Sequence, residues 1–234
     1  FRFDSGQVLA ESAVPLPDGV QITSADLGER RSYTQGYGLS DGSVILVKQG
    51  FEVTFPDNKR LITPTTAYPL GDKPLVVDPR GQAIRQLGVQ QTDDGSTIVA
   101  LTDDNRLLVS AVNVSTNAMT GETKSEIQQS EISPVPPGVR QLVIESKQRE
   151  LYVLHGDSSL ARYNISDKTN PRLLETVELA PAGQRVTALA MLSGGFSLIV
   201  GTDKGELSQW FLVRSEGANF VMKRIRGFAP MPAP

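Results

Sequence analysis

The clearest pattern in the chain runs through Val186-Thr-Ala-Leu-Ala-Met-Leu192, Ser193-Gly-Gly195, Phe196-Ser-Leu-Ile-Val200, Asp203-Lys-Gly205, Glu206-Leu-Ser-Gln-Trp-Phe-Leu-Val213 and Phe220-Val-Met-Lys-Arg-Ile225. Short runs of β-branched and aliphatic residues separated by Gly and Asp signals are typical of β-strands joined by tight turns. The stretch therefore predicts a unit of four antiparallel strands.

The same unit recurs upstream along the chain. Two further copies are predicted with strands at Val139–Ile144, Glu150–His155, Leu160–Ile165 and Arg172–Leu179, and at Ala83–Val89, Ser96–Leu101, Arg106–Val114 and Thr123–Ile132. A fourth copy runs from about Val20 to Leu70, and the middle turn of each copy carries an Asp, at Asp41, Asp104, Asp157 and Asp203. Repeated four-stranded units of this length are typical of β-propeller blades.

The sequence thus predicts an all-β, WD40-like β-propeller. We expect blades at 20–72, 73–134, 135–182 and 183–234, with a partial blade at 1–19. We expect a partial ring, with the remaining blades outside this chain, and the abrupt ends suggest an excised domain. Each first strand is expected to be apolar on both faces, as in Val186–Leu192, whereas the fourth strands can be polar, as in Ser125–Ser130.

Composition narrows the possible functions. The 234 residues carry a net charge of −3, so the chain has no excess of positive charge that would attract nucleic acid. The absence of cysteine excludes disulfides, thiolate metal sites and cysteine nucleophiles. No stretch approaches the roughly 20 apolar residues needed to span a bilayer.

A search for catalytic chemistry yields little. The single histidine, His155, ends a predicted strand and is interpreted as an ordinary strand-end residue. The four turn aspartates are interpreted as turn formers rather than as a cation site, because Asp and Gly suit tight hairpins. Phosphate-binding loops and a nucleophile elbow are missing from the sequence. We therefore expect no enzyme activity and no catalytic, cofactor or metal site.

Three residues are candidates for a partner-binding surface. Lys59 and Arg60 form a small basic group within a long predicted outer hairpin, although such charges also protect edge strands from pairing. Trp210 lies in a predicted third strand, where it either packs in the core or faces a partner.

Two segments resemble a known family. They are Gly38–Val47 continuing through Phe51-Glu-Val-Thr-Phe-Pro-Asp-Asn-Lys-Arg-Leu-Ile-Thr-Pro64, and Phe196–Phe211. Both resemble the large insert domain of phosphate ABC transporter permeases of the PstC type, from Gram-negative bacteria. Met119–Glu122 and Glu150–Leu154 add looser similarity.

The resemblance implies a domain on the periplasmic side of the inner membrane, within a permease whose membrane-spanning part is absent here. It also implies a role as an interaction or regulatory module for phosphate uptake, with the periplasmic phosphate-binding protein or a sensory partner, and the parent permease, as partners. Two alternatives stay open: a freestanding WD-repeat scaffold and a propeller hydrolase.

Overall fold

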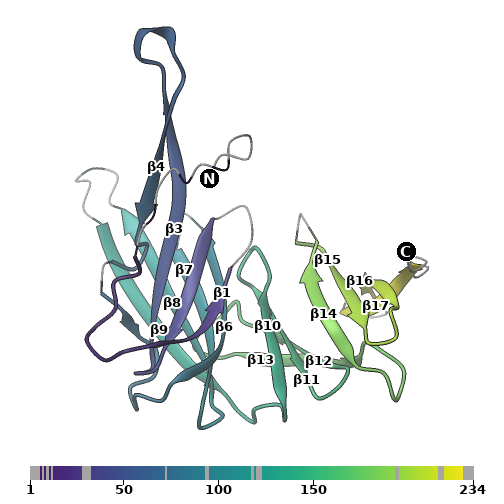
Figure 1. Cartoon of the computed structure of the whole chain (residues 1–234). Helices are drawn as coiled ribbons and strands as arrows, with labels where there is room; N and C mark the ends of the chain where they lie inside the picture. The colour runs from purple at the N-terminus through teal and green to yellow at the C-terminus, as the bar shows by residue number, and fades with distance from the viewer. Residues whose placement is uncertain are drawn as a thin grey trace. The chain divides into compact units, whose positions relative to one another are not determined.

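The protein is all-β and has the β-propeller fold that its sequence predicts. The computed structural model describes residues 6, 8, 11, 13–27, 33–71, 73–92, 95–116, 119, 123–192, 195–215 and 219–228. Within these residues the strands form four consecutive antiparallel sheets, each a meander whose first four strands pair in sequence order (Figure 1). Over the same ranges, no helix has the length and hydropathy to cross a bilayer.

The first sheet contains the longest strand. The sheet consists of β1 (Ile22–Asp26), β2 (Thr34–Leu39), β3 (Ser43–Thr54) and β4 (Leu61–Ala67), and the short β5 (Leu75–Val76) pairs with the start of β3. β5 was not predicted from the sequence, and it lies within the range 73–134 that was predicted as one blade. Residues 1–5, 7, 9–10 and 12 of the predicted partial blade lie outside the described residues.

The other three sheets follow the predicted strand pattern closely. Their strands are β6 (Ile84–Thr92), β7 (Gly95–Thr102), β8 (Leu107–Thr116) and β9 (Thr123–Ile132); β10 (Val139–Ile144), β11 (Glu150–His155), β12 (Ser159–Asn164) and β13 (Arg172–Glu178); and β14 (Val186–Met191), β15 (Ser197–Thr202), β16 (Leu207–Arg214) and β17 (Phe220–Phe228). The resemblance segment Met119–Glu122 lies largely outside the described residues.

The chain divides into two compact units. One comprises Phe1–Leu108 with Val112–Glu126, and the other comprises Val109–Ala111 with Ile127–Pro234. Within the first unit, β1 is joined to β6 because the hydroxyls of Thr23 and Ser24 donate to the Ile84 carbonyl at 2.8 and 2.7 Å. The Val89 amide also donates to the Asp26 carboxylate at 2.7 Å. Polar bonds thus join two successive sheets.

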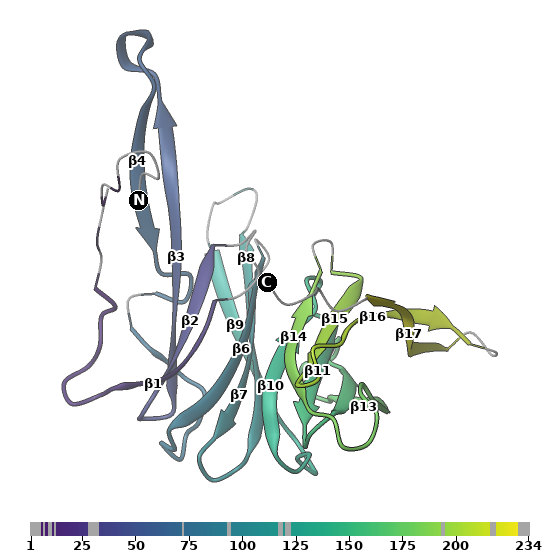
Figure 2. The same cartoon turned by 45° about the vertical axis from the view of Figure 1, so that its right-hand side comes forward.

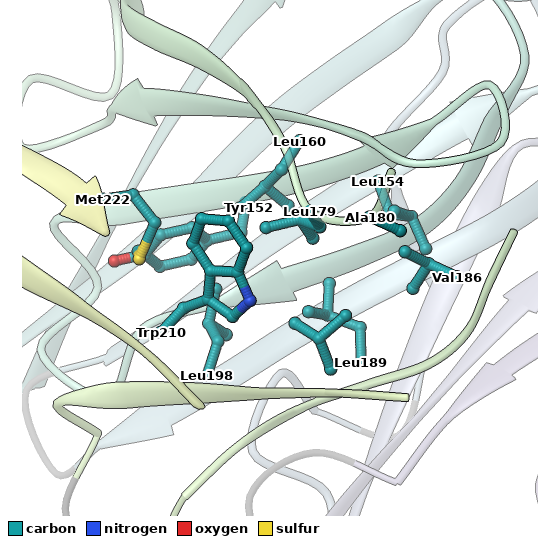
Figure 3. Close-up of a cluster of buried hydrophobic side chains, with 11 residues drawn as sticks. Tyr152, Leu154, Leu160, Leu179, Ala180, Val186, Leu189, Leu198, Trp210 and Met222 are labelled. Carbon is teal, nitrogen blue, oxygen red and sulfur yellow. The ribbon is translucent and has the colours of Figure 1, made fainter. Parts of the chain in front are cut away.

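The second unit has a hydrophobic core between its last two sheets. Eleven buried side chains form one cluster: Tyr152, Leu154, Leu160, Leu179, Ala180, Val186, Leu189, Leu198, Val200, Trp210 and Met222 (Figure 3). Burying this apolar area is the main favourable contribution to folding of the unit.

The first strand of the last sheet, which was expected to be apolar on both faces, is buried on one face only. Val186 and Leu189 of β14 are buried, but Thr187, Ala188 and Ala190 are exposed. β14 therefore packs on the cluster through Val186 and Leu189, with Met191 partly buried against it. The polar fourth strand is confirmed, since residues 124–127 of β9 are exposed.

Candidate interaction surface

The outer half of β3 and β4 forms a two-stranded ribbon that runs on past the rest of its sheet. β2 pairs with β3 only as far as Lys48, whereas β4 pairs with β3 from Lys48 to Thr54. Figures 1 and 2 both show β3 and β4 extending together beyond β1 and β2. We call residues 49–66 the ribbon. Strand alternation gives its side chains two distinct faces.

One face of the ribbon is apolar. Phe51 lies opposite Pro64, and Val53 lies opposite Ile62, so these four side chains share one side of the ladder. Phe55 comes directly after the end of β3, at the start of the tip. Phe51 is 60% exposed, Phe55 65% and Ile62 42%. We call these five residues the apolar strip.

The opposite face of the ribbon is mostly polar. Glu52 lies opposite Thr63, Gly50 opposite Thr65 and Thr54 opposite Leu61. The ribbon is therefore amphipathic, although it is only two strands wide and solvent reaches both of its faces. An isolated two-stranded hairpin is marginally stable in water, and an exposed apolar face is typical of a protein-binding site.

The tip of the ribbon carries the predicted basic pair. The short 3-10 segment Pro56–Asn58 turns the chain, with Asp57 and Asn58 at φ of 51° and 60°. Asp and Asn tolerate this left-handed region better than other non-glycine residues. Lys59 and Arg60 follow, both exposed, and neither forms an ion pair with any residue that the structure describes. Their charges are thus available to a partner.

The structure brings Lys59 and Arg60 together but places Trp210 elsewhere. Trp210 is 7% exposed and belongs to the core of the second unit, where Figure 3 shows its indole beside Tyr152 and Met222. Its Nε1 donates to the Ser208 hydroxyl at 3.0 Å. The core-packing interpretation describes its position, and Trp210 cannot belong to a partner surface while it stays buried.

The apolar strip was not predicted from the sequence. The signal was present as the alternation of Phe51 and Val53 on one strand, with Phe55 just beyond its end, followed by Ile62 and Pro64 on the next strand. The decisive step is the register, because only the pairing of Phe51 with Pro64 and of Val53 with Ile62 places both sets on the same face.

The turn aspartates make local hydrogen bonds in three of the four sheets. The Asp41 carboxylate accepts from the amide and hydroxyl of Ser43, and that of Asp203 accepts from the Arg185 amide. Asp104 accepts from the Thr102 hydroxyl and from Arg106 Nε at 2.9 Å. These hydrogen bonds stabilise the turns, and the three carboxylates therefore have a structural role.

Arg106 also binds a fully buried carboxylate, Asp78, at 2.6 Å. Burial alone would raise the pKa of Asp78, but hydrogen bonds from Arg106 and from the amides of Arg80 and Gln82 outweigh it, and the pKa is lowered. The group is thus an ion pair that fixes a loop. Among the described residues, no three His, Asp or Glu side chains are grouped so as to hold a metal ion.

Comparison with known proteins finds similarity in solved structures only. No family model matches the chain, and no curated protein matches it. The β-propeller domain of Cps50 (Swd1) from Myceliophteria thermophila aligns with 11% identity and a TM-score of 0.45, over 88% of this chain and 57% of that one. Apo AztD from Citrobacter koseri aligns with 10% identity and a TM-score of 0.46, over 86% of this chain and 45% of that one. The chain thus spans about half the length of each.

Proposed function

We propose that this chain is a non-catalytic extracytoplasmic domain of an inner-membrane phosphate ABC importer permease, and that it acts as a protein-interaction module for phosphate uptake. Two observations support the proposal. The segments Gly38–Val47, Phe51–Pro64 and Phe196–Phe211 resemble that family of permeases, and a propeller fold is consistent with a scaffold. The second of these segments lies within the ribbon.

The exposed apolar strip is the observation on which the docking role rests. Phe51, Phe55 and Ile62 expose apolar area that a binding partner would remove from water, and aromatic residues frequently dominate binding energy. Lys59 and Arg60 at the tip add positive charge that no residue in the described part of the chain pairs. The surface of the partner that would complement the strip and the tip is therefore an apolar groove bordered by carboxylates.

A protein fits this surface better than a membrane does. Insertion of the tip into lipid would carry Asp57, Lys59 and Arg60 ahead of the apolar side chains, and charged groups are costly to bury in a bilayer. A protein groove can instead pair these charges while it covers the strip. We therefore commit to a protein partner, and the phosphate-binding protein of the same periplasm is our first candidate.

The carboxylates of Asp78, Asp104 and Glu178 have lowered pKa values and are held in structural contacts, which supports the proposed absence of catalysis. The carboxylates of Asp78 and Asp104 are bound to Arg106, and that of Glu178 accepts from the hydroxyls of Ser158 and Ser159. Each of these contacts stabilises a turn or loop. A catalytic carboxylate would instead face an open cleft with a second reactive group beside it.

The test is a binding titration of the purified chain with the phosphate-binding protein, with and without phosphate. Interfaces of this kind commonly have micromolar affinity, a Kd of about 1 to 50 μM. Phe51→Ser is expected to weaken binding about 10- to 100-fold, because hot-spot aromatics contribute that much. Charge reversal in Lys59→Glu/Arg60→Glu is expected to slow association and to reduce its dependence on salt.

Thr63→Ser is the matched control, because Thr63 lies on the opposite face of the same ribbon. It should leave the Kd unchanged, and circular dichroism should show all variants folded. Failure to bind the phosphate-binding protein would overturn this choice of partner. Equal loss in Phe51→Ser and Thr63→Ser would overturn the role of the strip, and binding to anionic vesicles instead would favour a membrane.

A further inference from the structure

The edge of the ribbon along β3 exposes backbone hydrogen-bonding groups. In an antiparallel pair, the N–H and C=O of successive residues point alternately toward the partner strand and away from it. The Gln49 amide donates to the Tyr33 carbonyl at 3.0 Å, so the backbone groups of Gln49 point away from β4. By alternation, those of Phe51 and Val53 also point away from β4, and β2 pairs with β3 only as far as Lys48. Among the described residues, none bonds to this outer side of Phe51 and Val53.

The other edge of the ribbon, along β4, has a proline at its centre. Pro64 lies opposite Phe51 and Ile62 lies opposite Val53, so the backbone groups of Pro64 and Ile62 point away from β3. Proline has no N–H, and on an edge strand it hinders pairing with another chain. The edge along β3 is therefore the better of the two for pairing with a further strand.

Unpaired N–H and C=O groups at strand spacing complement another extended backbone, and peptides are commonly recognised by addition to such an edge. We infer that the partner of the ribbon adds an extended segment to the edge at Phe51 and Val53 and that this segment becomes a third strand. The inference rests on the docking role proposed above and specifies how the partner binds. The added strand also enlarges the apolar strip, because side chains directly opposite Phe51 and Val53 lie on the same face.

Glu52 indicates the charge of the added segment. Its side chain is exposed, and it forms no ion pair within the part of the chain that the structure describes. A second copy of this chain that paired Phe51 with Val53 would place Glu52 opposite its own equivalent, and like charges directly opposite each other are destabilising. A Lys or Arg opposite Glu52 is favourable instead. The segment is thus expected to belong to a different protein and to alternate apolar, basic and apolar residues.

The test uses the peptide acetyl-Thr-Val-Lys-Val-Thr-amide, whose Val residues would lie opposite Phe51 and Val53 and whose Lys would lie opposite Glu52. In the free protein, amide hydrogen exchange should be faster at Phe51 and Val53 than at Glu52 and Thr54, whose amides face β4. The peptide should slow exchange at Phe51 and Val53 and move their amide protons downfield, with a Kd of about 0.1 to 2 mM.

Methylation of the peptide nitrogens tests the hydrogen bonds on the unmodified protein. The Val amides of the peptide would donate to the ribbon, so methylating both should abolish binding. The Lys amide would point away from the ribbon, so methylating it alone should change the Kd by less than about 3-fold.

Val53→Pro and Ile62→Pro are a matched pair of variants, because the two residues lie opposite each other and each has its N–H on a different outer edge. Pro64 shows that the ribbon accommodates proline at such a position. Val53→Pro should weaken peptide binding by at least about 10-fold, whereas Ile62→Pro should change it by less than about 3-fold. The phosphate-binding protein should respond to the two variants in the same order.

Protection of Phe51 and Val53 in the free protein, equal binding of the two methylated peptides, or equal loss in the two proline variants would overturn strand addition. If the phosphate-binding protein binds and both proline variants weaken it equally, the docking role stands and strand addition is wrong. Pairing of the peptide with this edge, without any binding of the phosphate-binding protein, would support strand addition and overturn only the choice of partner.

Discussion

Arg162 of β12 is the most informative residue to perturb. Its guanidinium is 4% exposed and binds Glu150 and Glu175, each at 2.7 Å, and the Phe220 carbonyl at 2.6 Å. These contacts join two sheets of the second unit, because Glu150 and Glu175 lie on β11 and β13 while Phe220 begins β17. Arg162→Met keeps most of the apolar stem and leaves both carboxylates without their cation.

The expected loss follows from the burial of the partners. Removing one member of a buried ion pair destabilises a protein by about 3 to 5 kcal/mol. The side chains of Glu150 and Glu175 keep 21% and 17% of their exposure, and they keep hydrogen bonds from the Tyr152 hydroxyl and the Met222 amide. We therefore expect the lower end, a loss of about 3 kcal/mol in the free energy of unfolding.

Urea unfolding followed by the fluorescence of Trp210 measures this loss, because Trp210 is the only tryptophan and is buried in the same unit. Arg172→Met, at an exposed arginine of β13, is the control and should change stability by less than about 0.5 kcal/mol. Adding Glu150→Gln and Glu175→Gln to Arg162→Met should recover all but about 1 kcal/mol, since no buried charge is then unpaired. A loss below about 1 kcal/mol in Arg162→Met, or no recovery in the triple variant, would refute the reasoning.

Three further outcomes are expected. Gly38→Ala should lower the unfolding free energy of the first unit by about 1 to 3 kcal/mol in urea titrations followed by circular dichroism, because a Cβ there would lie 2.7 Å from Ile84 Cγ2; an unchanged midpoint would contradict this packing. Because the pKa of Asp78 is lowered on folding, its carboxylate stabilises the fold at pH values above its ordinary pKa of 3.8, and this stabilisation should disappear as the pH falls below about 4. Arg106→Ala should therefore flatten the dependence of the unfolding free energy on pH in that window, and an unaltered slope would count against the ion pair. Trp210→Ala should lower the free energy of unfolding, measured by thermal unfolding, by about 3 to 5 kcal/mol. A small change would contradict this and show that the cluster can collapse into the cavity that the indole leaves.

Strand and turn positions were predictable because their causes are local. The boundaries of β9, β10 and β11 match the prediction, since alternating apolar residues and Gly or Asp turns act over a few neighbours. The short β5 was not predictable in the same way. Its two residues pair with β3 from a distance of about thirty positions, and so short a segment has no period of its own.

The candidate surface was predictable only in part. Lys59 and Arg60 were recognisable as a basic pair in a long hairpin, and their exposure follows from that position. Which residues share their surface depends on the register of β3 with β4. A shift of one residue would have moved Phe51 and Ile62 to opposite faces of the ribbon.

The sequence alone determined the repeated four-strand units, the turns between them and the absence of cysteine chemistry, because composition and short-range preferences control each of these. Tertiary structure decided that Trp210 is buried, that Arg162 connects separate sheets and that His155 Nε2 is buried without a hydrogen-bond partner among the residues that the structure describes. Those properties depend on contacts between residues far apart in the chain, and packing between sheets sets them rather than the preferences of the residues themselves.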